Sequence, residues 1–416
     1  MKINILTLLG IFVFVFIIYF GVGTQFSFRP KWAVDYFNPM AQSLMQFRLD
    51  IPNPGQTHDL TEFKGKWYTP WGILPASLLI PPQLLKGRFI PTFYLSLFFS
   101  SLTTVVVFLL LKRLQKEFFH NLSTRGVYLI LVLFAFGTAQ FYVGTLGSVW
   151  HVNQIVSSFF GALGIFAIFK KNRSSIDYFI SSLCFGIGFL GRPTIIFLIS
   201  LPLSLFVFDL FQKKKLFLDQ KQKYIKQVII IFVLPLMFFC SVFFLYNYVR
   251  FGNVFQTGYD YIQESSNLQE IRKKNGLSSL KNIPQNAWYL LFELPTLKTV
   301  DNHIAFNFNL YGNSIFFLTP PFLTIFLSPL IIKKKRGIQI NPFISSLWIA
   351  VFSTIIPVLM HYSSGWMQFG YRYSLDITVL LLLLSVFGIR GKLNVLYVLG
   401  IILAIIMYIL GIRALM

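Results

Sequence analysis

The sequence has little charge and little cysteine for its length. Only 12% of its 416 residues are charged, about half the fraction usual in soluble proteins, while 55% are apolar and Phe alone supplies 49 residues. Compact soluble folds cannot hide so much apolar surface. Cys184 and Cys240 both fall within apolar stretches, which argues against a disulfide framework. The composition predicts an all-α integral membrane protein, with a single polytopic membrane domain over residues 1–416.

Acidic residues are much scarcer than basic ones. The chain has 14 Asp and Glu against 36 Lys and Arg, which gives a net charge of +22. In a soluble protein this balance would suggest nucleic acid. Here the basic residues stand in short runs between apolar stretches, such as Lys213 to Lys215 and Lys333 to Arg336, a pattern typical of topology signals and of contact with membrane lipids. We therefore expect membrane lipids, and no nucleic acid, as partners.

The long apolar runs predict about 11 transmembrane helices (10–13), because one crossing takes about 20 residues. The run over 72–86 contains three prolines and predicts a re-entrant or interfacial element. With the N-terminus in the cytoplasm, more than half of the Lys and Arg lie inside and most acids outside, as the positive-inside rule requires. We expect an uncleaved N-terminal anchor and a multi-pass protein of the cell membrane (a bacterial inner or plasma membrane). The expected helices lie near 3–22, 89–111, 126–146, 152–169, 176–190, 193–211, 228–248, 314–332, 342–361, 375–389 and 393–412.

Two long outer loops, 23–88 and 249–313, hold much of the polar sequence and are expected to carry short interfacial helices. Long loops on a compact scaffold often carry function. The first contains Asp35, just after the first helix, and Asp59. A carboxylate at a membrane surface can have a raised pKa and act as a general base. The alternative is that these acids simply balance nearby Lys and Arg.

Aromatic residues surround a lysine in the run from Gly65 to Gly72, which includes Lys66, Tyr68 and Trp71. Trp and Tyr favour the membrane interface, so the run is consistent with an aromatic belt. It is equally consistent with a sugar-stacking platform beside a phosphate-binding lysine.

The last outer loop is short and contains Tyr371, Arg372 and Asp376. Arg372 and Asp376 are four residues apart, so on one helix they would share a face and could pair. The alternative is that Arg372 binds a phosphate, which suits the planar guanidinium. Arg192 is a further lone cation at a predicted helix junction, and His151 at another junction is expected to be structural.

Five motifs, taken in order, resemble one family. They run from Gly65 to Tyr68, Leu74 to Pro81, Gly191 to Thr194, Arg250 to Tyr259 and Gly365 to Asp376. The pattern resembles bacterial polytopic proteins placed with the GT-C superfamily of membrane glycosyltransferases. More distantly it is similar to protein O-mannosyltransferases and the lipid A aminoarabinose transferase.

The resemblance implies an inverting enzyme that transfers a sugar from a polyprenyl-phosphate donor to a lipid, glycan or protein acceptor on the outer face. It implies that Asp35 or Asp59 is the general base, and that Lys66 and Arg372 bind phosphate. The other residues expected to bind substrate are Tyr68, Trp71, Arg192, Tyr371 and Asp376. No cofactor is required, although an acid-rich loop can hold a divalent cation weakly.

Two other classes of function remain open. A transporter or flippase of lipid-linked saccharides would use the same aromatic and basic groups without a base. A polymerase or ligase of cell-surface polysaccharide would also act on lipid-linked sugars.

Overall fold

The computed structural model describes residues 4–30, 33–212, 218–300, 303–334 and 337–415. Some of the basic residues interpreted as topology signals lie outside the described residues: Lys213 to Lys215, and Lys335 and Arg336. The described chain is mostly helical, with short two-stranded sheets.

Within these residues, seven helical stretches are long and apolar enough to cross a membrane. Such a set of helices is that of a membrane-embedded protein. The seven are α1 (Ile5–Gly23), α4 (Thr92–Glu117), α7 (Val149–Ile168), the stretch Pro193–Leu210, the stretch Ile229–Phe251, α14 (Pro342–Met360) and α16 (Val395–Leu415). The stretch Pro193–Leu210 combines the 3₁₀ helix η1 (Pro193–Ile199) with most of α9 (Ser200–Gln212), and Ile229–Phe251 is the end of α10 (Leu218–Phe251).

Four of the expected spans are shorter helices or are broken into pieces. The span expected over 375–389 is the helix α15 (Leu375–Gly388), which has only 14 residues. α8 (Ser175–Phe189) remains one short apolar helix. The span expected over 126–146 divides into α5 (Thr124–Phe136) and α6 (Ala139–Gly144), where Thr138 caps the second helix through a bond from the Gln140 N–H. The span expected over 314–332 becomes α13 (Ile315–Leu318) and the 3₁₀ helix η4 (Pro320–Leu327), because Pro320 and Pro321 lack the N–H groups that a continuous helix needs.

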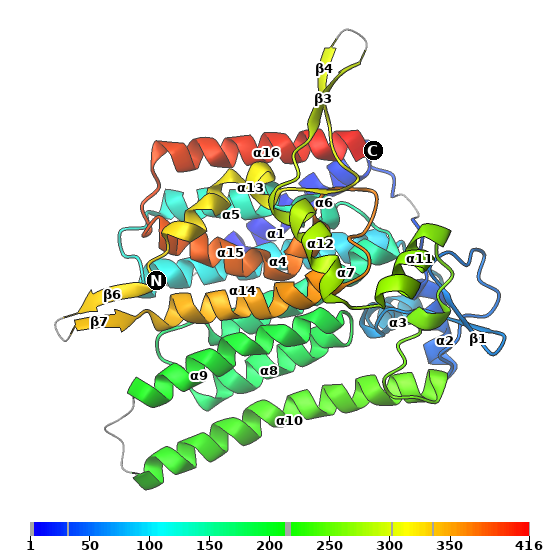
Figure 1. Cartoon of the computed structure of the whole chain (residues 1–416), viewed down its shortest axis with the longest axis horizontal. Coiled ribbons are helices and arrows are strands. Elements are labelled where there is room, and N and C mark those ends of the chain that lie inside the picture. Colours follow the sequence, from blue (N-terminus) through cyan, green and yellow to red (C-terminus); the bar gives the residue numbers. More distant parts are fainter. Residues whose placement is uncertain (1–3, 31–32, 213–217, 301–302, 335–336, 416) are drawn as a thin grey trace.

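The helices lie roughly parallel in a bundle, with α10 along one edge and α16 along the opposite edge (Figure 1). α7 packs against both α4 and α8 near the centre. α15 (Leu375–Gly388) is buried along its whole length. One end of the bundle carries the hairpin of β6 (Ile331–Lys334) and β7 (Gly337–Ile340).

The other end of the bundle, called here the site end, carries the polar segments that follow α1 and α10. The first segment contains α2 (Phe37–Met45), the hairpin of β1 (Thr61–Phe63) and β2 (Lys66–Tyr68), and α3 (Leu74–Lys86). The proline-rich run expected to be re-entrant or interfacial is therefore mostly the helix α3, which packs against α2. Pro75 lies in its first turn, where a missing N–H costs no helical hydrogen bond.

The second segment at the site end contains η2 (Tyr259–Tyr261), α11 (Ser266–Asn275), η3 (Leu280–Asn282) and α12 (Ile283–Leu291). The hairpin of β3 (Thr296–Val300) and β4 (His303–Asn307) then projects away from the bundle (Figure 1). β5 (Tyr311–Asn313) pairs in parallel with β8 (Gln368–Gly370), which leads into η5 (Arg372–Ser374) and α15. This pairing brings the segment after α14 alongside the segment after α12.

Candidate functional site

The two polar segments of the site end are joined at Asp59. The Asp59 N–H donates to the carbonyl of Gln263 at 2.7 Å, and the Gln263 N–H donates to the carbonyl of Leu60 at 2.8 Å. Asp59 itself has a φ of 61°, a left-handed conformation that Asp adopts more readily than most residues. Backbone hydrogen bonds thus hold Asp59 at the junction between sequences about 200 residues apart.

Aromatic side chains surround the Asp59 carboxylate. Trp150 Nε1 donates to Asp59 Oδ2 at 2.9 Å, and His58 Nε2 lies 3.8 Å from the same oxygen. Trp71 meets the Trp150 ring edge-on at 6.3 Å and stacks on Tyr36 at 6.1 Å. The Asp59 side chain is still 20% exposed, so a ligand at the aromatic surface could reach it.

The pKa of Asp59 is raised above its usual value. Burial is the main cause, and the negative charge of Glu264 adds to it. The charges of His58 and Arg372 and the hydrogen bond from Trp150 offset part of the increase. A carboxylate with a raised pKa accepts a proton more readily, as a general base must.

Arg372 is a buried cation that pairs with no carboxylate of the described residues. Its exposed fraction is 7%, and within the described parts of the chain it forms no ion pair. Its Nε has no hydrogen-bond partner there either. The guanidinium packs beside Gly365, where an added Cβ would come within 3.1 Å of Arg372 Nη2. Because burying an uncompensated charge is costly, such a group commonly marks a binding site for an anion.

The pairing of Arg372 with Asp376, one of the two alternatives for these residues, is not formed. Asp376 pairs with Arg192, whose Nε donates to the two carboxylate oxygens at 2.7 and 3.0 Å, and it also accepts a bond from Thr194 Oγ1 at 2.7 Å. Its side chain is fully buried. Arg372 belongs to η5, before α15 begins at Leu375, so the two residues do not share an α-helical face.

The two arginines act on a common set of neighbours. Burial, and then the charges of Arg192 and Arg372, lower the pKa of His361 to about 4, so this imidazole is neutral at pH 7. Burial also raises the pKa of Tyr371 and keeps its hydroxyl protonated. The Tyr371 hydroxyl has no partner among the described residues. The region around Arg372 therefore combines positive charge with neutral polar groups.

The structure assigns Asp35 a capping position. Asp35 Oδ1 accepts the N–H groups of Phe37 at 2.8 Å and Asn38 at 3.1 Å, and Oδ2 accepts a bond from the Asn38 amide. Burial raises the pKa of Asp35, and these hydrogen bonds offset part of the increase. The carboxylate thus caps the N-terminus of α2, as acidic residues before a helix commonly do.

Lys66 and Tyr68 lie apart from this group. Lys66 is exposed on the β1–β2 hairpin. The pKa of the neighbouring Asp50 is lowered, mainly by a hydrogen bond from Arg48 and to a smaller extent by the charge of Lys66. Tyr68 is buried with its ring 5.4 Å from that of Phe251. The structure thus connects six of the nine expected site residues through contacts or charge: Asp59, Trp71, Arg192, Tyr371, Arg372 and Asp376.

Sequence reasoning missed Glu264 entirely. Its side chain is only 1% exposed; it accepts a bond from Arg272 Nε at 2.7 Å and another from the Tyr362 hydroxyl. Arg272 pairs with its charge, and the two bonds tie α11 to the segment after α14. No motif surrounds Glu264, so only the three-dimensional arrangement reveals it. Trp150 stands next to His151 at a predicted helix junction, but nothing in the sequence indicates its bond to Asp59.

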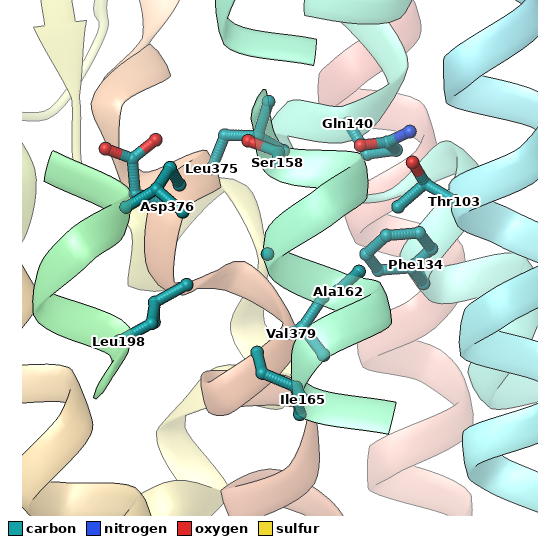
Figure 2. Close-up of a pocket in the computed structure, with 12 residues that line it drawn as sticks. Thr103, Phe134, Gln140, Ser158, Ala162, Ile165, Leu198, Leu375, Asp376 and Val379 are labelled. Carbon is teal, nitrogen blue, oxygen red and sulfur yellow. The ribbon is translucent and has the colours of Figure 1, made fainter. Parts of the chain in front are cut away.

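A small polar cavity lies beside Asp376 inside the bundle (Figure 2). Its volume is about 10 Å³, close to the space that one water molecule needs. Asp376, Ser158, Gln140 and Thr103 line one level of it, and apolar side chains such as Val379 line the rest. This cavity is too small to hold a sugar or a lipid.

Among the described residues, no group of three or more His, Cys, Asp or Glu side chains is placed to hold a metal ion. Comparison of the chain with family models, with curated proteins and with solved structures finds no match.

Proposed function

We propose that this protein is a membrane glycosyltransferase of the GT-C type. It moves a sugar from a polyprenyl-phosphate donor to a lipid, glycan or protein acceptor. In this proposal the site end faces the outside of the cell membrane and the N-terminus lies in the cytoplasm. The shorter helices α5, α8 and α15 and the η4 region complete about 11 membrane crossings.

The observation that carries the proposal is that a candidate base, Asp59, lies within the electrostatic influence of a candidate anion-binding residue, Arg372. One is a partly exposed carboxylate whose pKa is raised, and the other is a buried guanidinium with an unpartnered Nε. The charge of Arg372 acts on Asp59, yet the two do not form an ion pair. A base and an anion-binding cation that are close but separate suit a reaction in which a hydroxyl engages one and a phosphate the other.

The proposed reaction uses these two residues in one step. Asp59 takes the proton of the acceptor hydroxyl, and the hydroxyl oxygen forms a bond to the anomeric carbon of the donor. The bond between that carbon and the phosphate oxygen breaks, and the electron pair leaves with the phosphate. Arg372 stabilises the leaving phosphate, as a guanidinium does for a developing negative charge. Attack opposite the phosphate inverts the anomeric centre.

Trp71 and Trp150 support a sugar as the substrate. Trp150 donates to the Asp59 carboxylate and Trp71 packs against the Trp150 ring, and an aromatic face with a polar edge suits the apolar face and hydroxyl groups of a sugar. The base is assigned to Asp59 rather than Asp35, because the Asp35 oxygens already cap α2. Lys66 is not assigned to the phosphate.

The test is transfer of labelled sugar from a panel of polyprenyl-phosphate donors to a membrane extract, with purified protein in lipid vesicles. We expect Asp59→Asn to lower transfer about 100-fold or more, the usual contribution of a general base. Asp35→Asn should keep transfer within a few-fold of wild type once folding is matched. Asp50→Asn, which changes another acid of the same segment that is paired with Arg48, serves as the control.

Transfer that survives Asp59→Asn would overturn the assignment of the base. Label that crosses the vesicle membrane unchanged, in wild type and in Asp59→Asn alike, would favour a flippase instead. Products that carry many added sugar units would favour a polymerase.

A further inference from the structure

A large apolar groove lies away from the candidate site, between α1, the α5–α6 region and α16. Its volume is about 830 Å³, within the range of ligand-binding pockets in proteins. Its walls include Phe14 and Ile18 of α1, Phe136 and Phe141 of α5 and α6, and Ile409 of α16. α1 packs along α4, whereas α16 packs along α5, and this difference opens the space between α1 and α16.

The groove ends in a strained turn just after α1. Gln25, Phe26 and Phe28 all have φ values between 52° and 57°, a conformation that is costly for residues other than glycine. The turn folds back on the helix, so that the Phe26 ring would come within 3.2 Å of a Cβ added at Gly21. Gln25 and Phe26 consequently line the mouth of the groove.

Arg413 is the one charged residue among the described residues that line the groove. It lies in the last turn of α16, at the same end of the bundle as the C-terminus of α1 and the site end (Figure 1). It is exposed and forms no ion pair with a carboxylate of the described residues. The groove thus has an apolar body that runs into the bundle and a positive charge at its mouth.

Aromatic residues pack between α16 and β8, the strand that leads to Arg372. The Phe369 ring lies 4.7 Å from that of Tyr142 and 5.3 Å from that of Tyr408. It also fills the space at Gly411, where an added Cβ would meet Phe369 at 2.3 Å. Tyr408 and Gly411 of α16 therefore face this aromatic cluster, and neither lines the groove.

We propose that the groove binds a phospholipid with an anionic headgroup, taken from the membrane leaflet at the site end. One acyl chain lies against α1 and α16, and the phosphate of the headgroup lies at Arg413. The apolar walls match an acyl chain, and the single cation at the mouth matches the charge of the headgroup. This lipid is distinct from any donor at Arg372, so the inference does not depend on the proposed reaction.

The test is native mass spectrometry of the detergent-purified protein with phosphatidylglycerol and phosphatidylcholine that carry identical acyl chains. We expect wild type to bind phosphatidylglycerol about fivefold more tightly, the effect of one basic residue near an anionic lipid. Arg413→Gln should remove this preference. Ile409→Trp should fill the groove and lower the binding of both lipids.

The matched control is Leu396→Trp, at the opposite end of α16. Leu396 is 77% exposed and does not line the groove, so this variant should bind lipid as wild type does. Equal affinity of wild type for the two lipids would overturn the inference, as would a preference that survives Arg413→Gln. Lipid binding that is unchanged in Ile409→Trp, or a polyprenyl phosphate retained in place of a phospholipid, would also overturn it. If Ile409→Trp fails to fold, Arg413→Gln still decides the question, because it changes an exposed residue.

Discussion

The buried pair of Arg192 and Asp376 predicts a large loss of stability when one partner is removed. Asp376 is fully buried and Arg192 is only 17% exposed. Asp376→Asn would leave the guanidinium with no counter-charge, and breaking a buried pair in this way costs about 3–5 kcal/mol. The loss of the charge-assisted bond from Thr194 is part of this cost. We expect a decrease of that size in the free energy of unfolding, measured by detergent titration in mixed micelles.

A double-mutant cycle identifies the source of this effect. Replacing both partners, as in Arg192→Met with Asp376→Leu, removes the stranded charge, so the two changes should couple by about 2–3 kcal/mol. The control is Asp50→Asn, which breaks a pair between Asp50 (side chain 11% exposed) and Arg48 (45% exposed). This change leaves only a solvated guanidinium without a partner, and pairs with an exposed partner contribute about 0–1 kcal/mol. A cost for Asp376→Asn no larger than that of Asp50→Asn, or additive effects in the cycle, would refute the reasoning.

Three further outcomes follow from the site end. Gly72→Ala should lower the free energy of unfolding by about 3 kcal/mol or more, because a Cβ there would lie 1.9 Å from the carbonyl oxygen of Leu190; Gly55→Ala, in open space, should change it little in the same titration. Asp35→Ala should lower the free energy of unfolding by about 1 kcal/mol, the usual value of a helix cap, and an unchanged value would remove its capping role. Folding raises the pKa of Asp59 above its usual value of 3.8, so the folded protein favours the protonated carboxyl. The contribution of Asp59 to stability is therefore complete below pH 3.8 and is lost as the pH rises through the pKa of the folded state. Asp59→Asn should therefore gain stability relative to wild type between pH 4 and pH 7, and a difference that does not vary with pH would contradict the raised pKa.

The sequence predicted the long helices well, because a helix that crosses a membrane needs an apolar run of about 20 residues, which is visible in the sequence. α1, α4, α7, α14 and α16 all lie close to the expected ranges. The region over 314–332 was harder, since its composition is apolar but its prolines interrupt the backbone hydrogen bonds. Apolar composition indicates which segments are buried, whereas the positions of prolines decide whether such a segment is one continuous helix.

The pairing of charges could not be predicted from local spacing. Arg372 and Asp376 have the right separation for a helical pair, but Arg372 lies before the start of α15. The partner of Asp376 is instead Arg192, which is 184 residues away in the sequence. The same limit applies to the two candidate bases. Asp35 accepts hydrogen bonds from residues that follow it directly in the sequence. Asp59 is instead bonded to Trp150 and Gln263, which are distant in the sequence.

The most direct test of the central claim is to measure sugar transfer and donor affinity together in the Asp59→Asn variant. If Asp59 is the base and Arg372 holds the phosphate, this variant should bind the polyprenyl-phosphate donor within about twofold of wild type while transfer falls about 100-fold or more. A variant that keeps its transfer rate, or one that loses transfer only in proportion to lost donor affinity, would contradict the account.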